Sequence, residues 1–178
     1  MTDLWPRVEP LLSRVERPAR YLNHEWGCTQ KKDAPFSFCM IYPDTYELGQ
    51  ANQAVRILVN AVNKTENLRA ERAFLPAVDM CDLMREEGLP LFSLESCTPV
   101  NEFDVVGITL PHELCATNVL EVLDLAGIPV LASDRCEDDP IIVGGGPCAY
   151  NPEPFALFFD AITIGEGETA TPETIERI

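Results

Sequence analysis

The sequence predicts an α/β domain with a doubly wound, mainly parallel sheet and an N-terminal helical arm. From residue 36 onward, short apolar runs alternate with stretches whose apolar residues recur at helical spacing. The clearest run, residues 104–110, is almost continuously apolar, as expected of a parallel strand covered on both faces. Gly88 and Gly127 follow two of the amphipathic stretches, and glycine is the usual residue after a helix. Strands separated by helices imply right-handed crossovers and therefore a parallel sheet.

Residues 1–33 are predicted to form the arm. Apolar residues recur at helical spacing up to Val15, and Pro10 interrupts or restarts this helix. Residues 17–21 and Trp26 indicate an extended segment laid on an apolar surface. Two alternatives are open, because the arm either packs on its own domain or docks onto a neighbour.

Residues 34–178 are predicted to form the α/β domain. Its expected strands are residues 36–42, 70–75, 91–94 (a short edge strand), 104–110, 128–132, 141–143 and 161–164. Its expected helices are residues 48–63, 78–87 and 113–126. Residues 174–178 continue a helical pattern with no glycine or asparagine to end it, so we expect a domain truncated from a longer polypeptide.

The composition is that of a folded, acidic domain. Its 178 residues suit one α/β domain with a full core, since 46% are apolar and 24% charged. A net charge of −16 argues against direct binding of a nucleic-acid backbone. No apolar run approaches the roughly 20 residues that span a bilayer, and the first residues lack the form of a signal peptide. We therefore expect a cytoplasmic protein with no membrane or nucleic-acid partner.

The cysteines and histidines indicate neither a metal centre nor disulfides. The seven cysteines form no CxxC pair and no CxxxCxxC motif, so the chain carries no iron–sulfur cluster by that motif. An odd number of cysteines without an export signal indicates free thiols in a reducing compartment. With two histidines, His24 and His112, we expect no dedicated transition-metal site.

The carboxyl ends of the strands are the expected place for a ligand, because open parallel sheets bind ligands where the strand order reverses. Loops at residues 43–49, 109–112, 144–147 and 165–168 should meet there. Gly144, Gly145 and Gly146 let the backbone approach a flat or phosphate-bearing ligand, and a tight turn with positive φ is the alternative. The Gly-Glu-Gly-Glu loop either brings carboxylates to the site or forms an acidic turn before a helix. Neither glycine run matches GxGxxG or a P-loop, which leaves little support for a Rossmann nucleotide site.

The other polar residues of these loops have ordinary structural explanations. Asp44 and Thr45 are expected to cap the helix that follows the first strand. His112 stands at a predicted helix start, where a capping or solvent-facing role competes with a role in the site. No Ser-His-Asp or Cys-His arrangement is supported, so no catalytic residue is assigned.

Asp44, Tyr46 and Gly49 form an Asp-x-Tyr-x-x-Gly pattern directly after the first predicted strand. The pattern resembles the Asp-x-His-x-x-Gly motif of cobalamin-binding domains, whose histidine supplies the lower axial ligand of cobalt. Counterparts of the Ser-x-Leu and Gly-Gly motifs of that fold follow at residues 109–111 and 144–145. The resemblance implies a cofactor-binding set made of Asp44, Tyr46, Gly49, Thr109, Leu110, Gly144, Gly145 and Gly146. A phenol is a far poorer cobalt ligand than imidazole, so any bound cobalamin is expected to be base-off, without a histidine ligand.

The ordered set of motifs resembles the N-terminal B12-binding-like domain of the family of B12-binding domain-containing radical SAM proteins. The matching stretches are residues 17–21, 42–49, 88–96, 103–107, 118–120, 125–129, 144–154 and 164–168. The resemblance implies a flavodoxin-like, cobalamin-binding-like fold.

It also implies an accessory domain that positions a cofactor or substrate for a C-terminal radical SAM domain of the same polypeptide. A [4Fe-4S] cluster and S-adenosylmethionine would belong to that missing C-terminal part, and the full-length protein would be a radical SAM enzyme, while this fragment alone would not be catalytic. Two other interpretations stay open. The domain could be an interaction module that packs on the radical SAM barrel without a cofactor, or a flavin- or nucleotide-binding domain that uses the same sheet edge.

Overall fold

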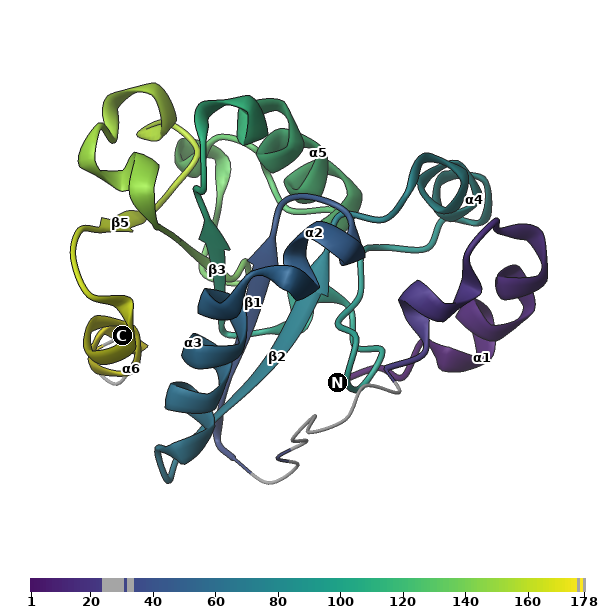
Figure 1. The fold of residues 1–178 in the computed structure, drawn as a ribbon, viewed down its shortest axis with the longest axis horizontal. Coiled ribbons are helices and arrows are strands. Elements are labelled where there is room, and N and C mark those ends of the chain that lie inside the picture. Colours follow the sequence, from purple (N-terminus) through teal and green to yellow (C-terminus); the bar gives the residue numbers. More distant parts are fainter. Residues whose placement is uncertain (24–30, 32–33, 176, 178) are drawn as a thin grey trace.

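The computed structural model describes residues 1–23, 31, 34–175 and 177, which form a five-stranded sheet with helices on both sides (Figure 1). All of its strand pairs are parallel. The strands are β1 (Phe36–Tyr42), β2 (Leu68–Phe74), β3 (Val105–Thr109), β4 (Ile141–Gly145) and β5 (Ala161–Thr163). The predicted fold class, a flavodoxin-like doubly wound α/β domain, is confirmed.

The strand order is β2-β1-β3-β4-β5, so the order reverses between β1 and β3. The chain forms β2 on one side of β1 and then returns to the other side, where Phe38 of β1 lies beside Val105 and Ile41 lies beside Ile108 of β3. Because all strands are parallel, the loops that follow them lie at one edge of the sheet. This carboxyl edge includes the reversal point, where sheets of this kind bind ligands.

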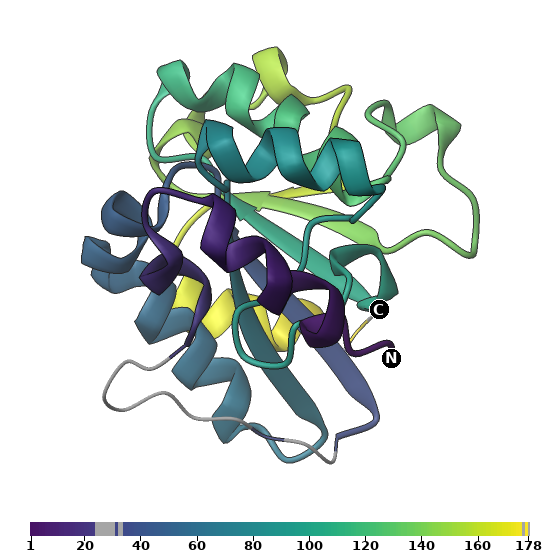
Figure 2. The same ribbon diagram turned by 90° about the vertical axis from the view of Figure 1, so that its right-hand side faces the viewer.

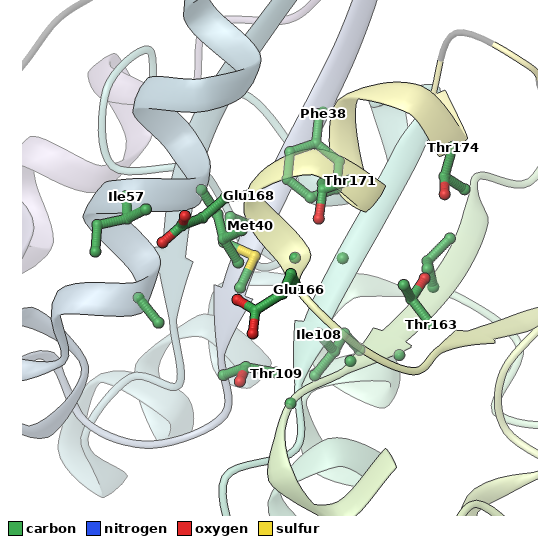
Figure 3. Close-up of a pocket in the computed structure, with 18 of the residues that line it drawn as sticks. Phe38, Met40, Ile57, Ile108, Thr109, Thr163, Glu166, Glu168, Thr171 and Thr174 are labelled. Atoms are coloured by element: carbon green, nitrogen blue, oxygen red, sulfur yellow. The ribbon is translucent and has the colours of Figure 1, made fainter. Parts of the chain in front are cut away.

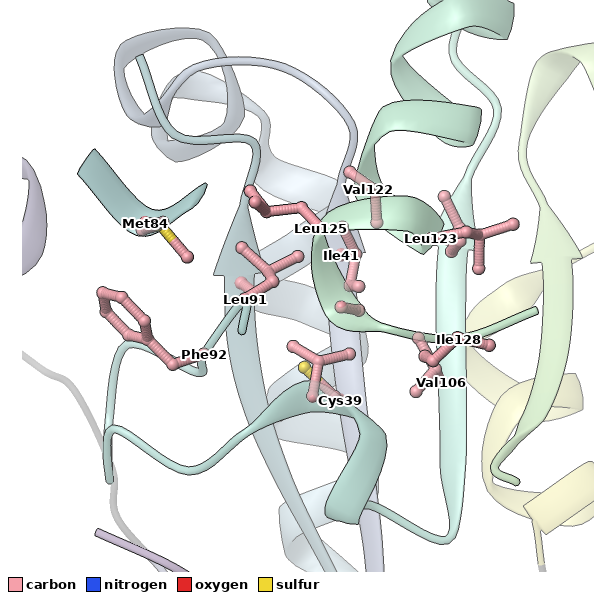
Figure 4. Packing of buried hydrophobic residues seen from close by; sticks show 14 of the residues in the cluster. Cys39, Ile41, Met84, Leu91, Phe92, Val106, Val122, Leu123, Leu125 and Ile128 are labelled. Carbon is pink, nitrogen blue, oxygen red and sulfur yellow. The ribbon is translucent and has the colours of Figure 1, made fainter. Parts of the chain in front are cut away.

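Helices cover both faces of the sheet. After the arm, the α-helices are α2 (Tyr46–Ala51), α3 (Gln53–Lys64), α4 (Val78–Glu87), α5 (Ala116–Ala126) and α6 (Gly167–Ile175). Residues of α4 and α5 pack on the face that carries Cys39, Ile41 and Val106 (Figure 4). Residues of α3 and α6 pack on the opposite face, with Phe38 and Met40. Two apolar layers therefore enclose the sheet, as the continuous apolar strands predict.

The described part of the arm packs on its own domain. It comprises the short α1 (Trp5–Val8) and two 3₁₀ helices, η1 (Glu9–Arg14) and η2 (Pro18–Tyr21), and lies against α4 (Figure 2). Val8 and Tyr21 belong to the same buried cluster as α4 and α5. The first of the two alternatives for the arm therefore holds for this part, whereas the prediction for Trp26 falls outside the described residues.

The predicted helix over residues 48–63 is wrong in its extent, because the chain forms two helices there. Asn52 separates α2 from α3 with an extended backbone, ψ 114°. Its side-chain oxygen accepts a hydrogen bond from the backbone N–H of Ala54 at 2.9 Å. An asparagine that caps a new helix in this way competes with continuation of the old one.

Two predicted strands are also wrong. Residues 91–94 form only an isolated bridge, between Phe92 and Pro99, and residues 128–132 form no strand. In the second segment, the Arg135 side chain donates hydrogen bonds to the carbonyl oxygens of Pro129 and Val130, and the segment pairs with no sheet strand. The first run is buried, and Ile128 and Val130 of the second run pack on the core without forming a ladder, whereas Leu131 is exposed.

The remaining short elements connect the sheet and its helices. They are η3 (Val100–Glu102), η4 (Glu113–Cys115), η5 (Ala132–Asp134), η6 (Pro147–Tyr150) and η7 (Glu153–Phe155). The predicted helix over residues 113–126 is thus η4 followed by α5, and Gly88 and Gly127 end α4 and α5 with φ of 58° and 68°. No helix in the described part of the chain is long and apolar enough to cross a membrane.

Candidate functional site

A cavity of about 490 Å³ lies between the sheet, α3 and α6 (Figure 3). Met40, Val143 and Gly145 form part of its floor on the sheet, and Ile57 and Thr171 line it from the two helices. The cavity runs along the sheet face to the carboxyl edge, where residues of the loops after β3, β4 and β5 line it. The cavity therefore reaches the edge of the sheet where a ligand is predicted, and it lies on a sheet face that α3 and α6 cover only partly.

Two glycines shape the floor in different ways. A β-carbon at Gly107 would overlap with the Phe38 ring, so this glycine makes room for a side chain of the neighbouring strand. A β-carbon at Gly145 would meet nothing closer than the carbonyl oxygen of Thr163, at 3.9 Å. Gly145 thus leaves bare backbone facing open space, and any larger side chain there would enter the cavity.

The other two glycines of the triple run have structural roles. A β-carbon at Gly144 would lie 3.0 Å from the Phe159 ring. Gly146 has φ of 109°, and a β-carbon there would lie 3.1 Å from the Thr109 hydroxyl oxygen. Both features predicted for the run therefore occur in it. Gly146 forms a positive-φ turn, and Gly145 leaves backbone atoms open to the cavity.

Hydrogen bonds fix the loop after β3 against the loop after β4. The backbone N–H of Leu110 donates to the carbonyl oxygen of Gly145 at 2.6 Å, and the N–H of Cys148 donates to the carbonyl oxygen of Leu110 at 3.0 Å. These bonds extend the pairing of β3 and β4 beyond the strands and hold Thr109 beside the glycine turn. These two loops therefore form the carboxyl-edge end of the cavity together.

The polar groups of the cavity are mostly neutral. Thr109, Thr163 and Thr171 line it (Figure 3). Glu166 lines it from the loop before α6, and Glu168 lines it from the first turn of α6. Among the described lining residues there is no lysine, arginine or histidine. Such a surface suits a flat, neutral group with hydrogen-bonding atoms on its rim and offers no side-chain cation to a buried anion.

The predicted cofactor-binding residues divide into two sets. Thr109, Gly144, Gly145 and Gly146 line the cavity, together with the Gly-Glu-Gly-Glu loop at residues 165–168. The other four do not line it: they are Asp44, Tyr46, Gly49 and Leu110. The cofactor-binding role of all eight residues stays a prediction.

The Asp-x-Tyr-x-x-Gly residues make packing and turn contacts. The Tyr46 ring meets the Phe74 ring edge-on, with centroids 5.5 Å apart. A β-carbon at Gly49 would overlap with the same Phe74 ring. The Asp44 carboxylate accepts a hydrogen bond from the backbone N–H of Thr45 at 2.7 Å, and Thr45 is the N-cap of α2 without a side-chain cap bond. The motif thus positions α2 against the end of β2.

His112 lies outside the cavity as well. It is exposed at the start of η4, and its ring nitrogens lie 3.5 and 3.6 Å from the Cys115 sulfur. Burial raises the pKa of the Cys115 thiol, and the negative charge of Asp44 adds to the shift. Cys115 is therefore a neutral thiol, and within the described part of the chain no three His, Cys, Asp or Glu side chains group in a way that could hold a metal ion.

Sequence patterns did not identify the helical wall of the cavity. Asn52, Ile57 and Leu58 line it from α3 and its cap, and Thr171 and Thr174 line it from α6. The three-residue spacing of the two threonines places them on one side of a helix and is a signal that could have found them. The contribution of α3 depends on which sheet face it covers, which its own pattern does not reveal.

The fold and this cavity define a flavodoxin-like α/β domain with a ligand-sized site that reaches its carboxyl edge. Residues 54–178 match the family described as "Radical SAM proteins, N-terminal". This match covers most of the chain, so the protein belongs to that family and is an N-terminal accessory domain of radical SAM proteins. The predicted association with radical SAM proteins is confirmed at this level.

The chain is also similar to an uncharacterized protein of Methanocaldococcus jannaschii, MJ0966. The two are 27% identical over 132 residues, which cover 72% of this chain and 23% of that protein. The chain thus spans about a quarter of the length of this relative.

Proposed function

We propose that this domain positions a cofactor for a radical SAM domain of the same polypeptide, and that the cofactor is cobalamin bound without a histidine ligand from the protein. The observation that carries the proposal is the cavity beside Gly145, where bare backbone and a threonine rim face open space at a sheet edge suited to ligands. The full-length protein would then be a radical SAM enzyme whose [4Fe-4S] cluster and S-adenosylmethionine belong to its C-terminal part.

The size and lining of the cavity support a site for one part of cobalamin. Its volume of about 490 Å³ falls within the roughly 300–1,000 Å³ of small-molecule sites. Residues of the cavity would hold the benzimidazole tail of the cofactor, since the space is too small for the whole molecule. Met40, Val143 and the Gly145 backbone offer an apolar floor to a flat ring, while Thr109 and Thr163 offer hydroxyl groups to its rim.

The described residues around the cavity offer no imidazole to cobalt. Tyr46 stands where the related motif has histidine, and its ring packs on Phe74. His112 does not line the cavity, and His24 lies outside the described residues. When bound, cobalamin would supply methyl-transfer or radical chemistry, and the residues of this chain would bind it, orient it and keep water from its tail.

The intracellular setting is part of the proposal. The six described cysteines are free, and burial raises the pKa of Cys97 to about 12 and that of Cys81 to about 11. Thiols of this kind are inert while they stay buried, which suits a protein that folds with reduced cysteines in the cytoplasm.

An interaction module without a cofactor is the second candidate. The packing of Tyr46 and Gly49 against Phe74 favours it, because this motif then serves only to place α2. A flavin- or nucleotide-binding domain has less support, since neither glycine run of the chain matches GxGxxG or a P-loop.

Titration of the purified chain with hydroxocobalamin tests the proposal. We expect saturable binding near micromolar affinity, about −8 kcal/mol, and an absorption spectrum without the signature of a nitrogen ligand from the protein. A histidine-ligated spectrum would show that His24 or His112 replaces the missing ligand and would contradict the proposed mode. Absence of binding at high micromolar cofactor would favour the interaction module.

A further inference from the structure

A large apolar side chain is exposed within six residues of the end of each of the five strands. Leu48 follows β1, Val78 follows β2, Leu114 follows β3, Tyr150 follows β4 and Ile164 follows β5. Their exposed fractions run from 55% for Ile164 to 86% for Leu114. Because the sheet is parallel, all five lie at its carboxyl edge, and we call them the edge row.

The edge row extends across the whole sheet. The strand order places its members in the sequence Val78, Leu48, Leu114, Tyr150 and Ile164. Neighbouring strands lie about 4.8 Å apart, so the strand ends that these residues follow span roughly 20 Å of the edge. Single exposed apolar residues are ordinary, whereas a set gathered on one edge marks a binding surface.

The fold does not need these side chains. The same loops bury other residues in the core, among them Leu110 after β3 and Ala149 after β4. Leu114 and Tyr150 therefore stay exposed beside neighbours that already complete the core. The folded domain therefore leaves both side chains on its surface.

We propose that the radical SAM domain of the same polypeptide packs on the edge row and covers the mouth of the cavity. This inference rests on the proposed function, in which such a domain belongs to the same chain. Pro111, Gly146 and Gly165 line the cavity from the loops that carry Leu114, Tyr150 and Ile164. A domain seated on the row would face the cavity mouth directly and exclude water from a group bound there.

Charge and connectivity favour this occupant over a second copy of the chain. Each copy has a net charge of −16, so two identical edges would repel one another. A linked domain has a high effective concentration, and an interface of moderate size then suffices. Glu113 and Glu166 are exposed beside the row, so the matching surface should have an apolar centre with basic residues around it.

Hydrogen exchange of the natural gene product, followed by mass spectrometry without added cobalamin, tests the proposal. Peptides that contain Val78 or Ile164 should exchange about tenfold more slowly in the gene product than in the 178-residue chain. The paired substitution Leu114→Glu and Tyr150→Glu should abolish this protection at the two unmutated positions. The matched control, Phe36→Glu with Leu157→Glu, changes residues that are 51% and 70% exposed outside the row and should keep the protection.

The contradicting outcomes are distinct. Equal exchange in the gene product and the shorter chain, or protection that survives the paired substitution, would overturn the proposal. Protection that disappears on dilution would identify a second copy as the occupant and would also overturn it. Thermal unfolding of the 178-residue chain should be unchanged by the paired substitution, since both side chains are already in solvent. Cobalamin titration of the same samples separates the two proposals, because cofactor binding without edge protection would refute only the docking.

Discussion

Gly146 brings the loop after β4 so close to Thr109 that a β-carbon on the glycine would lie 3.1 Å from the threonine hydroxyl oxygen. The glycine backbone has φ of 109° and ψ of −172°, a conformation that is essentially restricted to glycine. This contact joins two of the loops that form the carboxyl-edge end of the cavity.

Gly146→Ala should therefore destabilise the domain by about 2 kcal/mol, from backbone strain and the close contact with Thr109. Urea unfolding measures this change. Gly145→Ala is the matched control, because its β-carbon has open space and its stability should stay within about 0.5 kcal/mol of the wild type. Equal stability of the two variants would show that the turn at Gly146 is not under this constraint.

A buried ion pair joins the edge strand β2 to the segment that precedes η3. The Arg72 guanidinium donates to the Glu95 carboxylate at 2.6 Å, and also donates to Gln50 and Asn23. Both side chains of the pair are almost fully buried. Burial raises the pKa of the Glu95 carboxyl, because removal from water disfavours its charge, and Arg72 opposes this shift.

Glu95→Gln should lower the free energy of unfolding by about 3 kcal/mol, because the Arg72 charge stays buried without this carboxylate. A double-mutant cycle with Arg72→Met measures the coupling. We expect the double variant to be more stable than the sum of the two single losses predicts. Strict additivity would mean that the pair contributes little beyond its separate residues.

The fold was largely predictable from the sequence because its strongest signals are local. The strand around Ile108 is continuously apolar, and Gly88 and Gly127 end their helices with positive φ. The runs at residues 91–94 and 128–132 misled because apolar composition reports burial and does not report pairing. Arg135, three residues beyond the second run, donates hydrogen bonds to carbonyl oxygens of that run, and no strand pattern predicts these bonds.

The candidate site was predictable only where one short motif forms it. Thr109 and Gly145 were found because they stand at the carboxyl ends of strands in the sequence. Tyr46 was assigned by resemblance to a histidine motif, and its place beside Phe74 depends on β2 lying next to β1. The α3 and α6 walls depend on which face each helix covers, and that follows from tertiary packing.

The thiols should differ sharply in reactivity. Cys136 is exposed, whereas Cys97 is buried with its pKa raised to about 12, so little of it is thiolate at pH 8. From this pKa alone, alkylation of Cys97 in the native protein should be about 1,000-fold slower than that of an ordinary thiol, as followed by peptide mass spectrometry. In denaturant without reductant, nearly all seven thiols should titrate. A consistent deficit of two or more in protein kept anaerobic would contradict the proposed intracellular setting.

The central claim, that the cavity beside Gly145 holds cobalamin, is tested most directly by isothermal titration of three proteins with the cofactor. We expect the wild type to bind near micromolar affinity and Gly145→Ala to stay within about tenfold of it. Gly145→Leu should weaken binding by about 100-fold or more, because its side chain fills the space over the floor, while its urea midpoint stays close to that of Gly145→Ala. Cobalamin binding that Gly145→Leu leaves intact, or a wild type that does not bind, would contradict the claim.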